Sequence, residues 1–299
     1  MNSYLRFCIF YGRVPVPADQ LTLRTYVAFL ARSLKPLSVN CYLNIVRIMH
    51  LEAGFENPLK DNFELQLICR GVARQLGTPP IQKLPLTVEI LEKIVTKLDF
   101  SLSSDLAFWA ACLIAFYGML RKSTLIPISE RQIENCIWRS DVINLCVDSF
   151  VIQIRHSKMI QFGQRVLQIP FCFCAVATLC PVRALILHLI ASRLPSLTPL
   201  FSFSRNGKVL SLTHKLFVTR LRSLLSICGF EPTSYSGHSF RRGGCTISYE
   251  AGLSLIDIKL RGDWKSHAFE RYLHVPMERV FASAQALSSC VANKSSNNH

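Results

Sequence analysis

His238 and Arg241 have the residue types and the spacing that point most directly to chemistry. They lie three positions apart in the stretch SGHSFRRGG (236–244), so a helix would place both side chains on the same face. A guanidinium donates paired hydrogen bonds to phosphate oxygens, and an imidazole moves a proton near neutral pH. The pair therefore suits work on a phosphodiester, although many helices with this spacing do no chemistry.

Trp264 and Tyr272 lie eight positions apart in the stretch RGDWKSHAFERYL (261–273), where we expect a turn at Gly262 and a helix from Ser266. A tyrosine hydroxyl becomes a nucleophile near neutral pH when positive neighbours favour its ionised form. For each residue alone an ordinary alternative stays open: a tryptophan packed in the core, and a tyrosine that caps a helix.

Arg121 and Lys158 add two positive charges. Arg121 follows the longest apolar run, 107–120, which is shorter than the roughly 20 residues that cross a bilayer and indicates a buried helix. Such a rigid helix can hold a guanidinium in a site, and the alternative is a solvated charge. Lys158 lies in the turn of an expected hairpin, 150–170, either as an ordinary surface lysine or as a mobile ammonium that donates a proton to a leaving oxygen.

The elements that must position these residues fall into two groups. Apolar residues at helical spacing predict a small all-helical unit at the N-terminus. Its expected helices lie near residues 2–11, 18–33, 37–53 and 60–76.

The second group is mixed, because short alternating segments interrupt the helical pattern. The expected strands lie near residues 143–147, 150–155 and 165–170. The expected helices lie near residues 88–98, 104–120, 181–193, 212–228, 239–251, 254–261 and 266–274. The predicted fold class is therefore α+β, mostly helical with a small sheet.

A segment rich in proline separates the two groups. Three prolines and a glycine in GTPPIQKLPLT (77–87), without apolar periodicity, are typical of an interdomain linker. We therefore expect a helical domain over 1–80, a linker over 81–87 and a second domain over 88–285. The polar ending SSNNH predicts a disordered tail over 286–299.

The net charge and the cysteine pattern indicate the kind of partner and the cellular compartment. The chain has 34 Lys and Arg against 19 Asp and Glu, a formal net charge of +15, which favours a polyanionic partner such as nucleic acid. Its 12 cysteines are scattered without a CxxC pair, which favours reduced thiols over disulfides or zinc. No secretory signal is visible, so we expect an intracellular, not a secreted, protein without a membrane segment.

The order of these features resembles the tyrosine recombinase, or phage integrase, family. It runs from Arg121 after an apolar helix to Lys158 in a hairpin, then to HxxR on a helix, G-x-W and a tyrosine eight residues later. GHSFRRGG and LRGDWKSHAFERYL look most like the recombinases of Crypton- and DIRS-like eukaryotic transposons. The resemblance covers nearly the whole chain. It implies a SAM-like core-binding domain followed by a catalytic domain of the DNA breaking-rejoining fold.

The resemblance implies a role for each residue that would face the phosphate. Arg121 and Arg241 match the two arginines that hold the non-bridging oxygens of the scissile phosphate. Trp264 occupies the His/Trp position, whose ring N–H binds the same phosphate. Tyr272 matches the nucleophile, which forms a 3′-phosphotyrosyl link.

Two further matches imply how protons would move. Lys158 matches the hairpin lysine, the general acid for the departing 5′ oxygen, and His238 matches the histidine that helps to accept the tyrosine proton. The positive charges of such a site replace a metal, so the resemblance implies no metal, cofactor or ATP. It also implies double-stranded DNA as the partner, a homotetramer on paired DNA sites and a nuclear location; for the protein off DNA, a monomer in solution stays open as an alternative.

Two features depart from the family pattern. Thr124 stands where family members often carry an acidic residue, and the first helix looks clipped at its start. Both favour a rival interpretation, a domesticated DNA-binding protein that keeps the fold and no longer cuts DNA. A second rival is a type IB topoisomerase, which shares the Arg, Lys, Arg and Tyr chemistry. The short helical N-terminal domain and Trp264 favour a recombinase.

Overall fold

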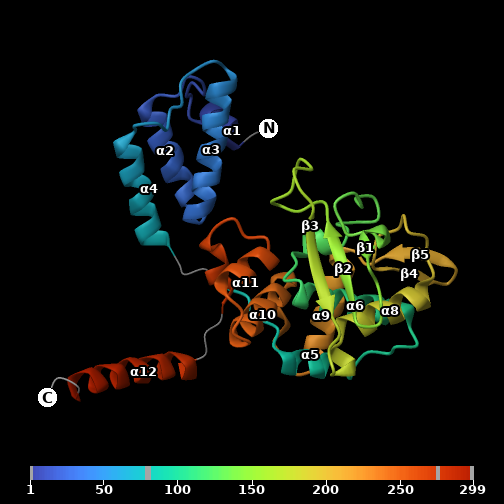
Figure 1. Ribbon diagram of the computed structural model, residues 1–299. Coiled ribbons are helices and arrows are strands. Elements are labelled where there is room, and N and C mark those ends of the chain that lie inside the picture. The colour runs from blue at the N-terminus through green and yellow to red at the C-terminus, as the bar shows by residue number, and fades with distance from the viewer. Residues whose placement is uncertain (1–2, 78–81, 274–276, 297–299) are drawn as a thin grey trace. The chain divides into compact units, whose positions relative to one another are not determined.

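The computed structural model describes residues 3–77, 82–273 and 277–296. The chain forms two compact units, Met1–Ile81 and Gln82–His299 (Figure 1). Over the described ranges, no helix is both long and apolar enough to cross a membrane.

The first unit is all helical, as the apolar spacing predicted. Its aromatic and aliphatic core includes Tyr4, Phe7, Tyr26 and Val46. Each helix begins within three residues of its expected start, because caps such as the Asp19 carboxylate, which accepts from the Thr22 N–H, define the boundaries. The four helices are α1 (Ser3–Phe10), α2 (Gln20–Ala31), α3 (Pro36–Glu52) and α4 (Phe63–Leu76).

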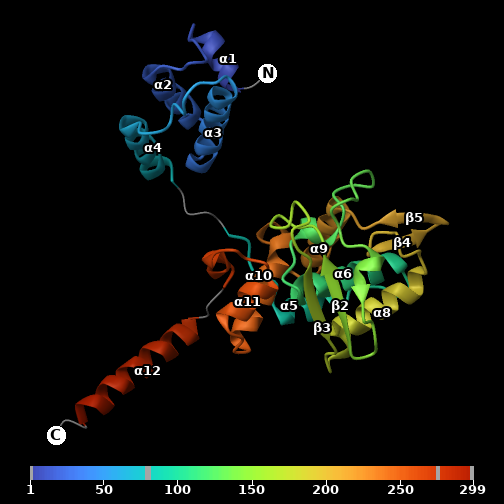
Figure 2. The same ribbon diagram turned by 45° about the horizontal axis from the view of Figure 1, so that its top comes forward.

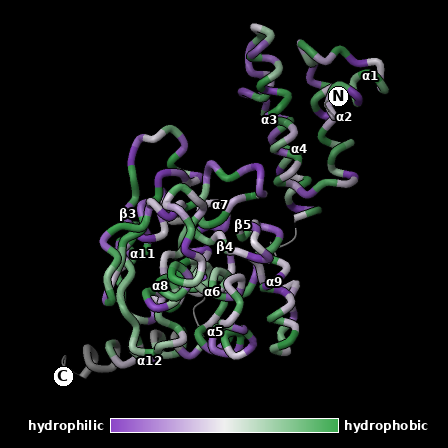
Figure 3. Tube along the Cα trace, turned by 90° about the vertical axis from the view of Figure 1, so that its right-hand side faces the viewer, coloured by the Kyte–Doolittle hydropathy of each residue, from purple (hydrophilic) through white to green (hydrophobic). Residues whose placement is uncertain are grey.

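The second unit is built around helix α6 (Ser103–Tyr117). Every residue of α6 from 105 to 116 is buried, which confirms the buried helix expected from its apolar run. Figure 3 shows this hydrophobic stretch inside the unit. Its other α-helices are α5 (Val88–Val95), α7 (Lys122–Leu125), α8 (Pro181–Ser192), α9 (His214–Ile227), α10 (Gly237–Glu250), α11 (Leu255–Arg261) and α12 (Met277–Ser296).

An antiparallel three-stranded sheet packs one face against this helical core. Strands β1 (Val142–Ile143), β2 (Ser149–Ile154) and β3 (Leu167–Cys172) lie in the order β1-β2-β3 (Figure 1), and Figure 2 shows β2 and β3 side by side. Alternate residues of β2 and β3 are buried, and Phe150 stacks on Phe171 with ring centroids 4.7 Å apart. The expected hairpin and the α+β class are confirmed. The strand expected over 143–147 is wrong beyond Ile143, because Asn144 adopts a left-handed φ of 52° that ends the extended backbone.

A second hairpin lies outside the strands expected from the sequence. Strands β4 (Ser202–Arg205) and β5 (Lys208–Ser211) pair antiparallel across a two-residue turn. The turn residues Asn206 and Gly207 have φ values of 51° and 73°. Asn-Gly is the preferred dipeptide for this turn, so the signal was present in the sequence.

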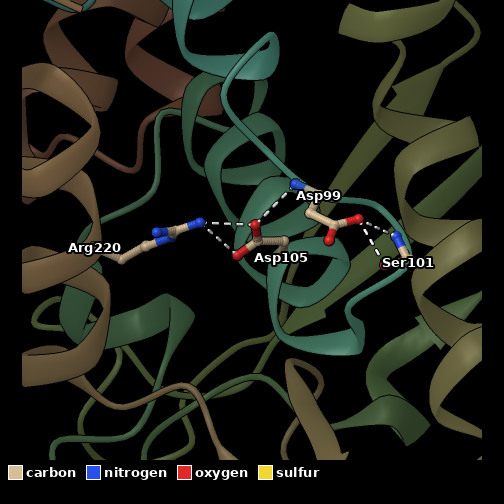
Figure 4. A network of polar contacts seen from close by, with 4 residues as sticks. All are labelled: Asp99, Ser101, Asp105 and Arg220. Carbon is tan, nitrogen blue, oxygen red and sulfur yellow. Dashed lines mark hydrogen bonds and ion pairs between the residues drawn. The ribbon is translucent and has the colours of Figure 1, made fainter. Parts of the chain in front are cut away.

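An ion pair between a buried carboxylate and a partly exposed arginine joins helix α9 to the start of α6 (Figure 4). The carboxylate of Asp105 is 4% exposed and accepts bonds of 3.0 and 2.8 Å from Nη2 of Arg220. The Asp105 carboxylate also accepts a hydrogen bond of 3.0 Å from the backbone N–H of Asp99. The carboxylate of Asp99 in turn accepts two hydrogen bonds from Ser101. The charge of Asp105 is thus fully hydrogen-bonded, which burial requires.

The segment expected as a linker belongs in part to the second unit. Residues 78–81 lie outside the described residues, but Leu84 and Leu86 are hydrogen-bonded to the chain before and within α10. The N–H groups of Leu84 and Leu86 donate to the carbonyls of Ser234 and Ser239 at 2.9 and 3.0 Å, and Leu86 is fully buried. Residues 82–87, with Pro85 among them, are therefore a docked segment of the second unit rather than a free linker.

The disordered tail expected over 286–299 is also corrected. Helix α12 continues to Ser296, while residues 297–299 lie outside the described residues. The segment from Leu287 to Ser296 contains no glycine or proline that would end a helix.

Two glycines let helix α10 pack closely on its neighbours. A Cβ added to Gly243 would lie 1.9 Å from the carbonyl oxygen of Leu86, and one added to Gly244 would lie 2.0 Å from that of Phe116. Both obstacles are backbone atoms, which cannot rotate away. The approach of α10 to the end of α6 therefore requires glycine at these positions.

We expect Gly244→Ala to lower the free energy of unfolding of the second unit by about 1–3 kcal/mol or more, since overpacking outweighs the helix propensity that alanine adds. All three tryptophans (109, 138 and 264) lie in this unit, so urea unfolding followed by tryptophan fluorescence measures it. Gly71→Ala is the control: a Cβ there meets nothing within 4 Å, and α4 lies in the other unit. An unchanged midpoint for Gly244→Ala would contradict the packing argument.

His188 introduces a dependence of stability on pH. Its side chain on α8 is fully buried, with Nε2 2.9 Å from the carbonyl oxygen of Leu200. Burial lowers the pKa of His188 to about 4, and the nearby charge of Arg139 acts in the same direction. The folded protein therefore holds this imidazole neutral.

We expect stability to fall as the pH is lowered from about 6.5 towards 4, because the unfolded chain binds a proton at His188 that the folded chain rejects. The contribution is fully present above about pH 6.5 and is lost at up to about 1.4 kcal/mol per pH unit below it. Urea unfolding of the wild type and of His188→Gln between about pH 7 and pH 5 measures the difference. Parallel pH profiles for the two proteins would disprove it.

Candidate active site

The start of helix α10 brings three of the predicted residues together. Ser236 caps the helix by accepting the His238 N–H at 3.2 Å, and His238 and Arg241 then lie on one face. A Cβ added to Gly237 would lie only 3.0 Å from Cβ of Lys122, so this turn of α10 packs against α7. Arg121 is the N-cap of α7, and its charge acts on both His238 and Arg241.

The guanidinium of Arg241 is 1% exposed, a burial that no local sequence pattern indicates. Nη2 donates to the carbonyl oxygen of Gly262 at 2.5 Å, and Nη1 donates to that of Met119, which follows α6. Burial, together with the charge of Arg121, lowers the pKa of Arg241 to about 9. The group therefore stays protonated at neutral pH.

Two aromatic rings lie beside this cation. The Cζ atom of Arg241 is 3.6 Å from the ring centroid of Trp264 and 5.3 Å from that of Tyr272. The centroids of the two rings are 5.3 Å apart, and the ring of Tyr272 is half-buried at the end of the 3₁₀ helix η4 (His267–Tyr272). The helix expected over 266–274 is thus a short 3₁₀ turn, and it places the Tyr272 ring against the arginine and the tryptophan.

Gly262 permits this stacking. A Cβ at Gly262 would lie 1.7 Å from Cζ3 of Trp264, so the indole occupies the space that any other side chain would need. The G-x-W pattern of the sequence therefore has a packing reason. The Nε1 atom of Trp264 and the Nε atom of Arg241 are both buried and have no hydrogen-bond partner among the residues that the structure describes.

The imidazole of His238 is solvent-exposed on one side and surrounded by positive charge on the other. Partial loss of hydration lowers its pKa, and the charges of Arg241, Arg121 and Lys122 lower it further. At neutral pH the ring is therefore uncharged and able to accept a proton.

Lys158 differs from the other predicted site residues, because within the described ranges no hydrogen bond or ring contact connects its side chain to them. It is exposed in a tight turn in which Ser157 and Ile160 exchange backbone hydrogen bonds of 3.1 Å. Its neighbour Ser157 donates its hydroxyl to the carboxylate of Asp263 at 3.0 Å. Lys158 is thus connected through Asp263 to the segment that holds Trp264.

Sequence reasoning missed Asp263 and its partner Arg165. Asp263 is 8% exposed and stands between Gly262 and Trp264, so its place in the G-x-W motif was the signal that could have found it. Thr124, which stands where family members often carry an acidic residue, is 4% exposed.

The site is marked by its cations and its aromatic rings. Within residues 3–77, 82–273 and 277–296, no group of three His, Cys, Asp or Glu residues could hold a metal ion. A cavity of about 660 Å³ lies elsewhere, over Asp105, Phe203 and Leu216, and none of the six predicted residues lines it. The converging cations and rings mark the site better than a cavity would, since an extended ligand binds on an open surface.

Comparison with known proteins relates the chain to a recombinase. No family model matches the chain. The chain is 25% identical over 286 residues to an integrase/recombinase xerD homolog of Selenomonas ruminantium, a match that covers 93% of this chain and 79% of the relative.

Two solved structures share the fold. The XerH site-specific recombinase, in a post-cleavage complex with a palindromic difH substrate, matches with a TM-score of 0.59 and 14% identity, over 95% of this chain and 76% of that one. The Tn1549 transposon integrase, in complex with circular intermediate DNA, matches with a TM-score of 0.57 and 14% identity, over 91% and 86%. At this identity the likeness shows the fold alone.

We expect Gly262→Ala to displace the Trp264 ring and to destabilise the second unit by about 1–3 kcal/mol, because the new Cβ and the indole cannot occupy the same space. A double-mutant cycle with Trp264→Ala, measured by thermal unfolding, tests the cause. In the Trp264→Ala background the clash is absent, so Gly262→Ala should then have little effect. Losses that add within about 0.5 kcal/mol would exclude a direct clash.

Proposed function

We propose that the chain is a member of the tyrosine recombinase/integrase family and that it breaks and rejoins DNA strands in site-specific recombination. One observation carries the proposal: a buried arginine, Arg241, contacts the rings of Trp264 and Tyr272 at a point where positive charges converge. Such an arrangement suits a tyrosine that attacks a phosphate held by cations.

In the proposed reaction Tyr272 is the nucleophile. Its phenol oxygen attacks the scissile phosphorus and the bond from phosphorus to the 5′ oxygen breaks, which leaves a 3′-phosphotyrosyl link and a free 5′ hydroxyl. The new ester conserves the energy of the broken one, so attack by a 5′ hydroxyl of another strand rejoins DNA without ATP.

The negative charge of the phosphate is held by groups that the fold already orients. Arg121 and Arg241 bind the non-bridging oxygens electrostatically. The N–H donors of Arg241 Nε and Trp264 Nε1, which lack protein acceptors over the described ranges, offer hydrogen bonds at the same place. Removing a donor of this kind typically slows chemistry by about 10²–10³-fold.

Two residues move protons in this proposal. His238, whose pKa is lowered, is uncharged at neutral pH and accepts the proton of Tyr272. Lys158 donates a proton to the departing 5′ oxygen from the turn of the β2–β3 hairpin. The proton lost by the nucleophile and the proton gained by the leaving group therefore pass through different side chains.

Double-stranded DNA is the proposed partner. The net charge of +15 suits it, and the XerH and Tn1549 structures are DNA complexes. We propose that residues 1–80 act as the core-binding domain and 88–285 as the catalytic domain, with a tetramer assembled on paired sites. A relationship to eukaryotic transposons and a nuclear location stay predictions that rest on the sequence resemblance alone. The relative that is 25% identical comes from Selenomonas ruminantium and does not support either prediction.

We expect the protein to form a covalent adduct with nicked duplexes tiled across the DNA that flanks its coding sequence, detected as a band that resists SDS. Tyr272→Phe should abolish the adduct, because phenylalanine has no nucleophilic oxygen. Arg121→Ala should reduce its rate by about 10²–10³-fold, because the transition state loses a cation.

The matched control is Tyr235→Phe, which removes one hydroxyl outside the site and should leave the adduct unchanged. Binding to DNA without any adduct would favour the rival interpretation that Thr124 suggests, a DNA-binding protein that does not cut. Relaxation of supercoiled DNA without joining of two sites would favour a type IB topoisomerase.

A further inference from the structure

The backbone at Asp263 has a conformation that favours glycine. Helix α11 ends at Gly262, and the N–H groups of Asp263 and Trp264 donate to the carbonyls of Leu260 and Lys259, each at 3.1 Å. In this helix-ending motif the residue after the cap is left-handed, and Asp263 has a φ of 53°. An aspartate at a position that glycine would occupy with less strain suggests that the carboxylate is required there.

The Asp263 carboxylate binds the β2–β3 connection with both oxygens. Oδ2 accepts the hydroxyl of Ser157 at 3.0 Å, and Oδ1 pairs with the guanidinium of Arg165. Asp263 is 8% exposed, so solvent screens its two bonds less than it would screen a surface pair. Both partners come from the connection between the strands, 155–166, and flank Lys158 in sequence.

The hydroxyl of Ser157 transmits this contact to the turn. It has one proton, which it donates to Asp263, and it accepts the backbone N–H of Met159 at 3.0 Å. Gln161 donates to the carbonyl of Lys158 at 3.1 Å, and Ile160 is fully buried. The backbone on both sides of Lys158 is therefore fixed, while the Lys158 side chain itself remains exposed.

We propose that Asp263 is a positioning residue that holds Lys158 in register with the phosphate-binding groups. The inference rests on the proposed function, in which Lys158 protonates the leaving 5′ oxygen. Asp263 also lies between Gly262 and Trp264 in the sequence. The carbonyl of Gly262 accepts a hydrogen bond from Arg241, and the ring of Trp264 stacks on the Arg241 guanidinium. One carboxylate thus ties the turn that bears the general acid to the helix end that holds the phosphate site.

Two variants remove one or both contacts of the Asp263 carboxylate and keep the left-handed backbone conformation at this position. Asp263→Gly deletes both bonds and suits the left-handed conformation, so the backbone at this position should be retained. Asp263→Asn tolerates the same conformation and keeps an oxygen for Ser157, but it loses the ion pair with Arg165. The expected order of cleavage rates is wild type, then Asp263→Asn, then Asp263→Gly.

The test compares two nicked duplexes, one with the ordinary 5′ bridging oxygen and one with sulfur in its place. Sulfur leaves as a thiolate and needs no proton, so a defect in general acid catalysis disappears on the second duplex. We expect Asp263→Gly to cleave the oxygen duplex about 10²-fold more slowly than the wild type and the sulfur duplex within about 3-fold of it. Lys158→Ala should show the same pattern, and Asp148→Asn, which removes an exposed carboxylate between β1 and β2, should change neither rate.

Equal loss on both duplexes would mean that Asp263 supports Trp264 and Arg241 rather than Lys158, and would overturn the inference alone. Wild-type rates for Asp263→Gly on both duplexes would overturn it as well. A wild-type protein that cleaves neither duplex would overturn the proposed function, and this inference with it.

Discussion

The buried guanidinium of Arg241 is the group around which the site is arranged. A charge withdrawn from water is tolerated where hydrogen bonds and polarisable neighbours replace hydration, and here the carbonyls of Met119 and Gly262 and the face of Trp264 do so. Met119 follows helix α6 and Gly262 ends helix α11. The cation on α10 therefore joins two helix ends that are far apart in sequence, and each must present its carbonyl at one point.

Meeting that requirement puts constraints on the surrounding backbone. Gly243 and Gly244 let α10 approach α6, and Gly262 leaves room for the indole of Trp264. Met119, the residue whose carbonyl receives Arg241, has a left-handed φ of 48°, which is unusual for a long side chain. Packing of the fully buried Met119 side chain maintains this conformation. Local strain here accompanies a contact that the chemistry would need.

The sequence predicted most helices, the β2–β3 hairpin and the common face of His238 and Arg241, because these depend on spacing within one element. It did not predict which charges are buried. The partners of Arg241 lie 122 and 21 residues away, and Ser157 lies 106 residues from Asp263, so no local pattern records them. The β4–β5 hairpin was missed for a different reason: its Asn-Gly turn is visible in the sequence, but no hairpin was predicted from it.

The electrostatics of the site link phosphate binding to proton transfer. The charges of Arg121, Lys122 and Arg241 lower the pKa of His238, and Arg121 contributes to the lowered pKa of Arg241. A phosphodiester placed among these groups would relieve their repulsion, so this arrangement of charges favours an anion. Its negative charge would also raise the pKa of His238 and make the imidazole a stronger proton acceptor. Under the proposed function, the histidine would therefore become a better base once a phosphate is present for Tyr272 to attack.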